Sequence, residues 1–345
     1  MKKRIGLSEI AQMAGVTRMT VSRYFHTPKS VAPATRERIA AAVEKTGFIP
    51  SRLPSMMSKS RSGTVGLIVP SFSNGVFSDI IDAADEAARA HGASLLLMHS
   101  GYDPQAEEAH VAALLSYRAD AVILCGAEHT ELTRRRLKSA AIPVAELLSV
   151  TSMPLGISYG IDYEALFLRM TKTLIGCGRK RIVYLGAQLD PRTLLRQRGY
   201  ETAMKEAGLK PRSLDTRRRS NFTVGRDLML EVASKGPLPD CVLCTNDDVA
   251  LGALIACQSL EISVPETLSV IGCNGLNFCD AAMPSLVSIK TPRREIAEAA
   301  CQRLFENLAS GKSEPEIKKW RCTLRKGGSA TEKEQQALSE ALSSL

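Results

Sequence analysis

The chain lacks any apolar run long enough to cross a bilayer. Its first ten residues, MKKRIGLSEI, are basic but do not contain the apolar core of a secretion signal. We therefore expect a cytoplasmic protein that makes no contact with a membrane. The sequence also has no Walker phosphate loop, no GxSxG motif and no glycine-rich dinucleotide fingerprint. These absences count against an enzyme, and no cofactor is expected.

Metal-binding patterns are also scarce. The five histidines are scattered, and no two have the spacing of a ligand set. Nine cysteines, an odd number in a chain without a secretion signal, predict free and mostly buried thiols. Cys241 and Cys244 form a CxxC, but they lie in the apolar run CVLC with no second pair nearby. Because alternate residues of a strand face opposite sides, we expect a buried strand there and no metal site.

Positive charge is concentrated at one end of the chain. The net charge is +9 over 345 residues, a length that predicts two or three domains. Residues 1–61 contain 12 Lys or Arg and 3 acidic residues, whereas the remainder contains 33 of each sign. All of the net charge therefore lies in the first sixth of the chain, which indicates a module that binds a polyanion.

Residues 7–23, LSEIAQMAGVTRMTVSR, predict two short helices joined by a tight turn. Apolar residues such as Ile10 and Ala14 share one helical face, Gly15 ends that helix, and Thr17 is a good N-cap for the next one. Two helices arranged in this way form a helix-turn-helix. The second helix offers to solvent the side chains that a groove-entering helix requires, namely Arg18, Met19, Ser22 and Arg23.

A third helix is expected to begin near Pro33 and to end at Gly47. We assign residues 1–48 to a helix-turn-helix headpiece. Residues 49–61 form a hinge, because IPSRLPSMMSKSR is rich in proline, serine and basic residues. This segment is either a passive linker or one that becomes ordered on DNA.

Apolar runs alternate with helical patterns after Thr64, first from TVGLIV to PVAEL and again from a helix near Asp162 to LSVIG. Strands that alternate with helices imply parallel sheets, and two such series predict two doubly wound α/β lobes. In this architecture ligands bind at the carboxyl ends of the strands, between the lobes. The last segment, TEKEQQALSEALSSL, is polar, and we expect it to be frayed or weakly helical.

The chain resembles the lactose/galactose repressor (LacI/GalR) family over roughly residues 1–325. The resemblance rests on LSEIAQMAGVTRMTVSR, TRERI with GFIPSR, PSFSNGVFSDI, RIVYLG, RQRGYETAM, CTNDDVALGA and VPETLSVIGCNG, in this order and spacing. Within the family, the chain looks most like regulators of gluconate or idonate use, on the basis of the segments TRMTVSRY, AELL after IPV, and CTNDD. The resemblance implies a sequence-specific DNA-binding transcription regulator, most simply a repressor, that forms a homodimer or a tetramer.

The family fold is a multidomain one, in which an all-α headpiece precedes a two-lobed core like the periplasmic sugar-binding proteins. The resemblance implies three chain crossings within a core of residues 62–325. Lobe 1 would comprise about 62–160 and 291–325, lobe 2 about 161–290, and residues 326–345 a polar tail. A small sugar or sugar-acid effector in the cleft would change the angle between the lobes and so the spacing of the headpieces.

The resemblance also assigns residues to double-stranded operator DNA. Arg18 and Met19 match the base-reading pair, and Met57 matches the hinge residue that enters the minor groove. Thr17, Ser22 and Arg23 match the other DNA-contacting positions. The effector positions of the family correspond here to Val76, Phe77, Ile80, Glu146, Ile161, Arg196, Asn246, Asn274 and Arg293.

Three residues depart from the family pattern. Leu148 stands where many members have an acid, although Glu146 lies two residues earlier on the same face. Asn274 replaces an Asp that usually accepts sugar hydroxyls, and Ala32 replaces the Ser that usually caps the third helix. The first two changes argue against a pocket for a plain neutral sugar.

Two arginines favour an anionic effector. Arg196 and Arg293 are expected to anchor a C5–C6 sugar acid or its phosphate, such as gluconate, because a guanidinium can bind a carboxylate through two parallel bonds. The neighbouring Arg192 and Arg198 are interpreted as part of a solvated helix face. Asn246 has two interpretations, since it either contacts ligand or caps the following helix.

Two other classes of function share parts of these patterns. A solute-binding protein for transport has the same two-lobed core, but the basic headpiece and the missing secretion signal count against it. An α/β enzyme such as a sugar kinase or isomerase is disfavoured, though weakly, by the missing phosphate loop and acid/base constellation.

Overall fold

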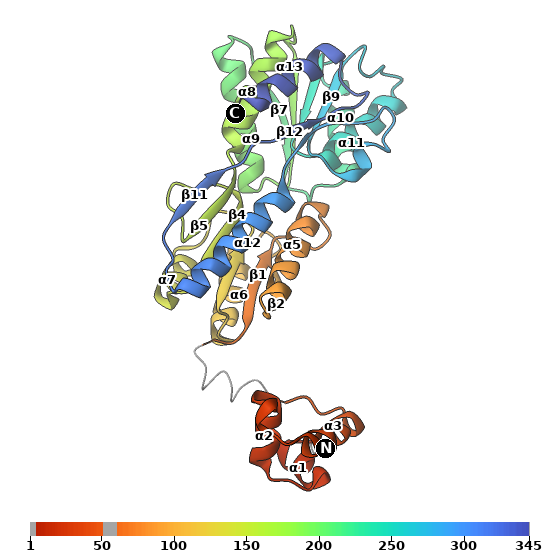
Figure 1. Ribbon diagram of the computed structural model, residues 1–345. Helices are drawn as coiled ribbons and strands as arrows, with labels where there is room; N and C mark the ends of the chain where they lie inside the picture. Colours follow the sequence, from red (N-terminus) through yellow and green to blue (C-terminus); the bar gives the residue numbers. More distant parts are fainter. Residues whose placement is uncertain (1–4, 51–60, 345) are drawn as a thin grey trace. The chain divides into compact units, whose positions relative to one another are not determined.

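The structure, a computed structural model, describes residues 5–50 and 61–344. It divides into two compact units, Met1–Ser62 and Gly63–Leu345 (Figure 1). We call the first the headpiece and the second the core, and each is described by itself. The hinge residue Met57 lies outside the described residues. No helix within the described ranges is long and apolar enough to span a bilayer.

Over residues 5–50 the headpiece contains three α-helices and a short 3₁₀ turn: α1 (Leu7–Ala14), α2 (Arg18–His26), η1 (Pro28–Ser30) and α3 (Pro33–Thr46). Its small core forms around Ile10, Val21 and Ile39, one fully buried residue from each helix. Gly15 ends α1 with a φ of 63°, a left-handed conformation that costs glycine little. The predicted helix-turn-helix is therefore confirmed, and so is the third helix that ends at Gly47.

The core contains two six-stranded sheets, each of which is the centre of one lobe. The first sheet has the order β11-β5-β4-β3-β1-β2 and is parallel throughout. Lobe 1 is built from β1 (Thr64–Val69), η2 (Gly75–Phe77), α5 (Ser78–Ala90), β2 (Ser94–His99), α6 (Pro104–Ser116), β3 (Ala121–Leu124), α7 (Glu131–Ala140), β4 (Val144–Ser149), β5 (Ile157–Ile161), α12 (Arg293–Ser310) and β11 (Glu316–Lys319).

The second sheet has the order β12-β10-β9-β8-β6-β7, and only the β10–β12 pair is antiparallel. Lobe 2 is built from α8 (Tyr163–Gly176), β6 (Ile182–Ala187), α9 (Pro191–Glu206), β7 (Arg212–Thr216), α10 (Phe222–Ser234), β8 (Cys241–Cys244), α11 (Asp247–Ser259), β9 (Ser269–Asn274), η3 (Asn277–Cys279), β10 (Val287–Lys290), β12 (Thr323–Arg325) and α13 (Glu332–Ser343). The predicted class of two doubly wound α/β lobes is confirmed.

The chain passes between the lobes three times. It leaves the first sheet after β5, returns after β10 to form α12 and β11, and enters the second sheet again at β12. Figure 1 shows α12 lying along lobe 1, where it packs on α5, β4 and β5. The predicted strand at CVLC is β8, and both Cys241 and Cys244 are buried in it as free thiols.

The carboxy-terminal segment corrects the expectation of a frayed tail. Thr331 caps α13 through a reciprocal pair of bonds with Glu334, and Leu338 and Leu342 are fully buried against lobe 2. The buried Glu334 carboxylate lies 2.6 Å from Arg179, and it also accepts a hydrogen bond from Ser269. Burial alone would raise the pKa of Glu334, but the bond from Arg179 holds it below its usual value.

We predict that Leu338→Ala lowers the free energy of unfolding of the core by about 2–5 kcal/mol, because it removes a fully buried side chain and leaves a cavity. Denaturant unfolding of the full chain measures the effect. Leu260→Ala, at a position 42% exposed, is the matched control and should cost far less. Equal effects of the two substitutions would show that α13 is not part of the cooperative fold.

Candidate functional site

The outer face of α2 presents a basic and apolar surface. Val21 points into the headpiece core, so the neighbouring positions on the opposite face reach solvent. Arg18 and Arg23 are exposed, Met19 is 65% exposed, and Ser22 is half-buried. Within the described part of the headpiece, neither Arg18 nor Arg23 forms an ion pair with a carboxylate. The two guanidinium groups are therefore available to an external anion.

Thr17 fixes the start of this helix. Its hydroxyl accepts a hydrogen bond from the Thr20 backbone N–H at 3.2 Å, as the sequence predicts for an N-cap. Ala32, at the equivalent position before α3, makes no side-chain capping bond. The helix that carries the exposed arginines is thus anchored at its first turn.

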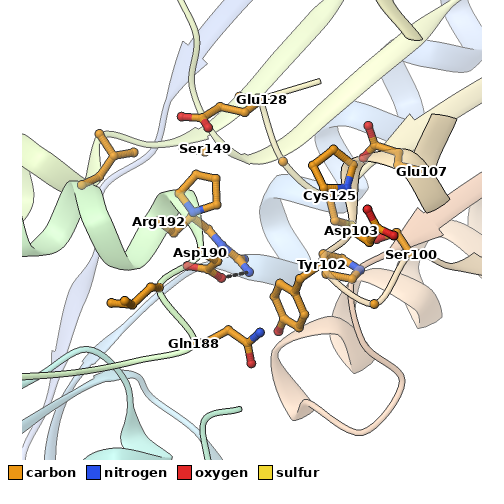
Figure 2. Close-up of a pocket in the computed structure, with 18 of the residues that line it drawn as sticks. Ser100, Tyr102, Asp103, Glu107, Cys125, Glu128, Ser149, Gln188, Asp190 and Arg192 are labelled. Carbon is orange, nitrogen blue, oxygen red and sulfur yellow. Dashed lines mark hydrogen bonds and ion pairs between the residues drawn. The ribbon is translucent and has the colours of Figure 1, made fainter. Parts of the chain in front are cut away.

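The core contains a cavity of about 430 Å³ between the two lobes. Its walls come from the segments that follow the carboxyl ends of β1, β2, β3, β4 and β6, which is where parallel sheets place ligands. Figure 2 shows Asp190 and Arg192 on one side, facing Asp103, Glu107 and Cys125 on the other. We call this space the wide cavity.

A narrower hollow of about 20 Å³ adjoins the wide cavity and shares Tyr102, Gln188, Asp190 and Arg192 with it. The hollow brings together four of the residues that the sequence assigns to an effector: Val76, Arg196, Asn246 and Asn274. Val76 comes from lobe 1 and the other three come from lobe 2. The hollow therefore lies where both lobes contribute side chains.

Arg196 is a buried cation that forms no ion pair with a carboxylate of the described residues. It is 5% exposed, and its guanidinium carbon lies 4.3 Å from the ring centroid of Tyr163. Its Nη1 donates to the Thr245 carbonyl at 2.8 Å, and its Nη2 donates to Asn274 Oδ1 at 3.4 Å. No hydrogen-bond partner among the described residues accepts from its buried Nε. Burying an unpaired charge is costly, so this group is suited to receive an anion.

Asn246 caps α11, which was one of its two interpretations. Its Oδ1 accepts from the Val249 N–H at 3.0 Å, and its Nδ2 donates to Ser220 Oγ at 2.7 Å. Capping does not remove it from the hollow, because its side chain also lines that space.

Arg293 differs from the expectation of a free cationic anchor. Its Nε and Nη2 donate to Asp79 at 3.1 and 2.9 Å, and its Nη1 donates to Thr291 Oγ1 and to the Asn274 carbonyl. Asp79 lies in the first turn of α5 and Asn274 ends β9, so this arginine connects lobe 1 to lobe 2. It lies outside the linings of both spaces.

Four other expected ligand positions are buried behind the cavity walls. Phe77, Ile80 and Ile161 pack in the main core cluster and line neither space. Glu146 is also fully buried and lines neither space, and its carboxylate accepts a hydrogen bond from the Leu155 N–H at 2.6 Å. The contacts of these four residues with a ligand stay predictions.

The sequence interpretation of Arg192 is also wrong. This residue is buried, lines both spaces, and lies 3.2 Å from Asp190 and 5.4 Å from the ring centroid of Phe77 in lobe 1. Burial alone would raise the pKa of Asp190, but the charge of Arg192 holds it below its usual value. The missed signal is Asp190–Pro191, an N-cap followed by a proline, which starts α9 directly before Arg192. Arg198, by contrast, is exposed as expected.

The pattern that describes bacterial regulatory proteins of the lacI family matches residues 6–51, which span the three headpiece helices. The pattern that describes periplasmic binding proteins and the sugar-binding domain of the LacI family matches residues 62–326. The two patterns cover the headpiece and most of the core.

Individual proteins agree with these matches. The transcriptional regulator GntR of Escherichia coli (strain K12) is 37% identical over 95% of this chain and 99% of its own. The regulator IdnR of the same strain is 40% identical over 88% of this chain and 92% of its own. Among solved structures, a LacI-family regulator from Silicibacter pomeroyi superposes with a TM-score of 0.88 at 25% identity, over 94% of this chain and 99% of that one.

We predict opposite effects of changing the caps of α2 and α3. Thr17→Ala should destabilise α2 by about 1 kcal/mol because the Thr20 N–H loses its acceptor, whereas Ala32→Ser should stabilise α3 by a similar amount. Hydrogen–deuterium exchange of the full chain measures both helices separately. Unchanged protection of α2 in the Thr17 variant would contradict its role as a cap.

Proposed function

Because the chain belongs to the LacI family of bacterial transcriptional regulators, we propose that it represses genes for the use of a sugar acid such as gluconate. In this proposal the headpieces bind operator DNA, and a small sugar acid between the lobes controls that binding. The observation that carries the choice of effector is the buried, acid-free guanidinium of Arg196.

The electrostatics of the headpiece support operator binding. All of the net positive charge of the chain lies in residues 1–61. The exposed Arg18 at the start of α2 stands where a recognition helix reaches base edges, and an arginine can donate two bonds to guanine O6 and N7. Arg23, one turn further along, is suited to a backbone phosphate, which positions the protein without reading sequence.

An exposed apolar patch on lobe 2 supports a two-fold dimer. Phe222, Ile255 and Met283 are 42%, 41% and 79% exposed. Phe222 packs edge-to-face on Phe278, and Gln258, on the same helix as Ile255, donates to the Met283 carbonyl. Apolar side chains gathered in this way are typical of a protein interface, and a two-fold dimer places two recognition helices on two half-sites.

The charge of the hollow favours a carboxylate. Of the ionisable groups that line it, Asp190 and Arg192 neutralise each other, and Arg196 remains as one uncompensated cation. A monoanionic sugar acid would compensate that charge, whereas a neutral sugar would leave the guanidinium desolvated and unpaired. Asn246 and Asn274 offer amide groups to the hydroxyls that such a ligand carries. Arg192 replaces Arg293 as the second cation of the site.

We predict that Arg18→Ala weakens binding to the cognate operator by about 1–3 kcal/mol and relaxes discrimination at one base position of each half-site. Gel shifts with single-base operator variants measure both effects. Arg23→Ala is the matched control and should weaken binding to all sequences alike. If Arg18→Ala left both affinity and base preference unchanged, the assignment of α2 as the reading helix would be overturned.

We predict that Arg196→Ala abolishes the response to the effector and preserves operator binding, which gives a regulator locked in one state. Calorimetry of the full chain with gluconate, idonate, 6-phosphogluconate and glucose identifies the ligand, and gel shifts with the same compounds show the response. Arg198→Ala, an exposed arginine two positions along α9, is the matched control. Binding of glucose and none of the acids would overturn the sugar-acid effector.

A further inference from the structure

A buried cluster lies directly behind one wall of the wide cavity. His129 is fully buried, its Nδ1 lies 2.6 Å from Glu107 Oε1, and its Nε2 lies 3.3 Å from Glu146 Oε1. The three residues come from different elements, since Glu107 is on α6, Glu146 is on β4, and His129 is in the segment between β3 and α7. No role has been assigned above to His129, whose imidazole lies between two carboxylates.

The cluster has one member that reaches the cavity. Glu107 lines the wide cavity (Figure 2). Its side chain remains 14% exposed, whereas the side chains of His129 and Glu146 are fully buried. Glu107 Oε1 is directed to the imidazole, and the same residue lines the cavity. The segment that carries His129 also supplies Gly126, Ala127 and Glu128 to the wall. The imidazole therefore fixes both a carboxylate and a stretch of backbone at the cavity.

Electrostatics keep the imidazole charged. Burial alone would lower the pKa of His129, but the hydrogen bond to Glu107 and the charges of Glu107 and Glu146 raise it to about 9. With His129 protonated, the two carboxylates and one imidazolium carry a net charge of −1. Glu107 accordingly presents a carboxylate that accepts hydrogen bonds and donates none.

We propose that Glu107 determines ligand specificity in the wide cavity by accepting hydroxyl groups and repelling a second anionic group, and that His129 is the residue that positions it. This inference rests on the sugar-acid function proposed above. The carboxylate of the ligand occupies the hollow at Arg196, and its polyol end extends into the wide cavity.

The distribution of charge supports this orientation. The wide cavity is lined by the carboxylates of Asp103, Glu107, Glu128 and Asp190, with Arg192 as the one cation among its lining residues. The hollow carries the opposite balance because of Arg196. A phosphate at the far end of a sugar acid would meet these carboxylates in a confined space, so the site favours the unphosphorylated acid.

The test compares gluconate with 6-phosphogluconate by calorimetry of the full chain at fixed ionic strength. Wild type is expected to bind gluconate more tightly. Glu107→Gln removes one negative charge from the wall and should shift the ratio of the two affinities by about tenfold towards the phosphorylated acid. Glu131→Gln, an exposed first-turn residue of α7 outside both linings, is the matched control and should leave the ratio unchanged.

Two further variants test His129 as the positioning residue. His129→Gln leaves the cluster with a net charge of −2 and should weaken gluconate binding by about tenfold. Adding Glu146→Gln restores the net charge to −1, so the double variant should recover most of the lost affinity. A purely structural histidine would give no recovery, because the second substitution adds another change to the packing.

The outcomes separate the two proposals. If wild type binds neither acid, the sugar-acid function is overturned, together with the inference that rests on it. If wild type binds gluconate and Glu107→Gln leaves the affinity ratio within about twofold of wild type, the specificity role of Glu107 is overturned and the sugar-acid function stands. Circular dichroism of each variant establishes that it is folded, and the Glu107 result decides the inference even if His129→Gln does not fold.

Discussion

The direction of the strands determines where the core can bind a ligand. The first sheet is parallel throughout and the second is parallel except for the β10–β12 edge pair, so the carboxyl ends of nearly all strands in a lobe meet at the same edge. Because the chain passes between the lobes three times, the two edges are held against each other and their connecting segments enclose a shared space. The wide cavity and the hollow are both lined by residues that follow strand ends, and the buried Arg192 and Arg196 are among these lining residues.

The buried charges are organised as two opposite environments a short way apart. Arg196 supplies a cation that carbonyl and amide oxygens stabilise but that no carboxylate neutralises. In the Glu107–His129–Glu146 cluster, two carboxylates flank one protonated imidazole, so the cluster carries a net negative charge. Between them, Arg192 and Asp190 form a nearly neutral pair that lines both spaces. A ligand with an anionic end and a polyhydroxylated end matches these two environments in one orientation, with its anionic end at Arg196.

Local signals predicted the headpiece and most of the core, because they act over a few residues. The cap at Thr17, the turn at Gly15 and the alternating apolar runs identify their elements without knowledge of the tertiary fold. Strand β5 was missed because it reads ISYGI, where Gly160 is required by close packing. A Cβ at Gly160 would lie 2.5 Å from backbone atoms of the neighbouring strand β4. Helix α13 was expected to be frayed or weakly helical because its polar sequence hides two leucines that only the tertiary fold buries.

The site residues were harder to predict, because burial and pairing are set by elements far apart in the sequence. Arg192 differs little from Arg198 as sequence, yet one is buried at the cavity and the other is exposed. Arg293 finds its acid, Asp79, more than two hundred residues away, which no local pattern reveals. The acid expected to replace the family carboxylate, Glu146, lies instead beside His129, away from the lining of the cavity.

The headpiece exposes its positive charge, whereas the core buries the charge of Arg196. We therefore expect DNA binding and effector binding to respond differently to salt. Arg18 and Arg23 are exposed, so their attraction to a polyanion involves the displacement of counterions and depends steeply on salt. Arg196 is buried among aromatic rings and backbone carbonyls, where mobile ions do not reach it and screening is weak. A change in ionic strength therefore acts mainly on the DNA affinity of the headpiece. Binding of the proposed sugar acid beside Arg196 should depend much less on ionic strength.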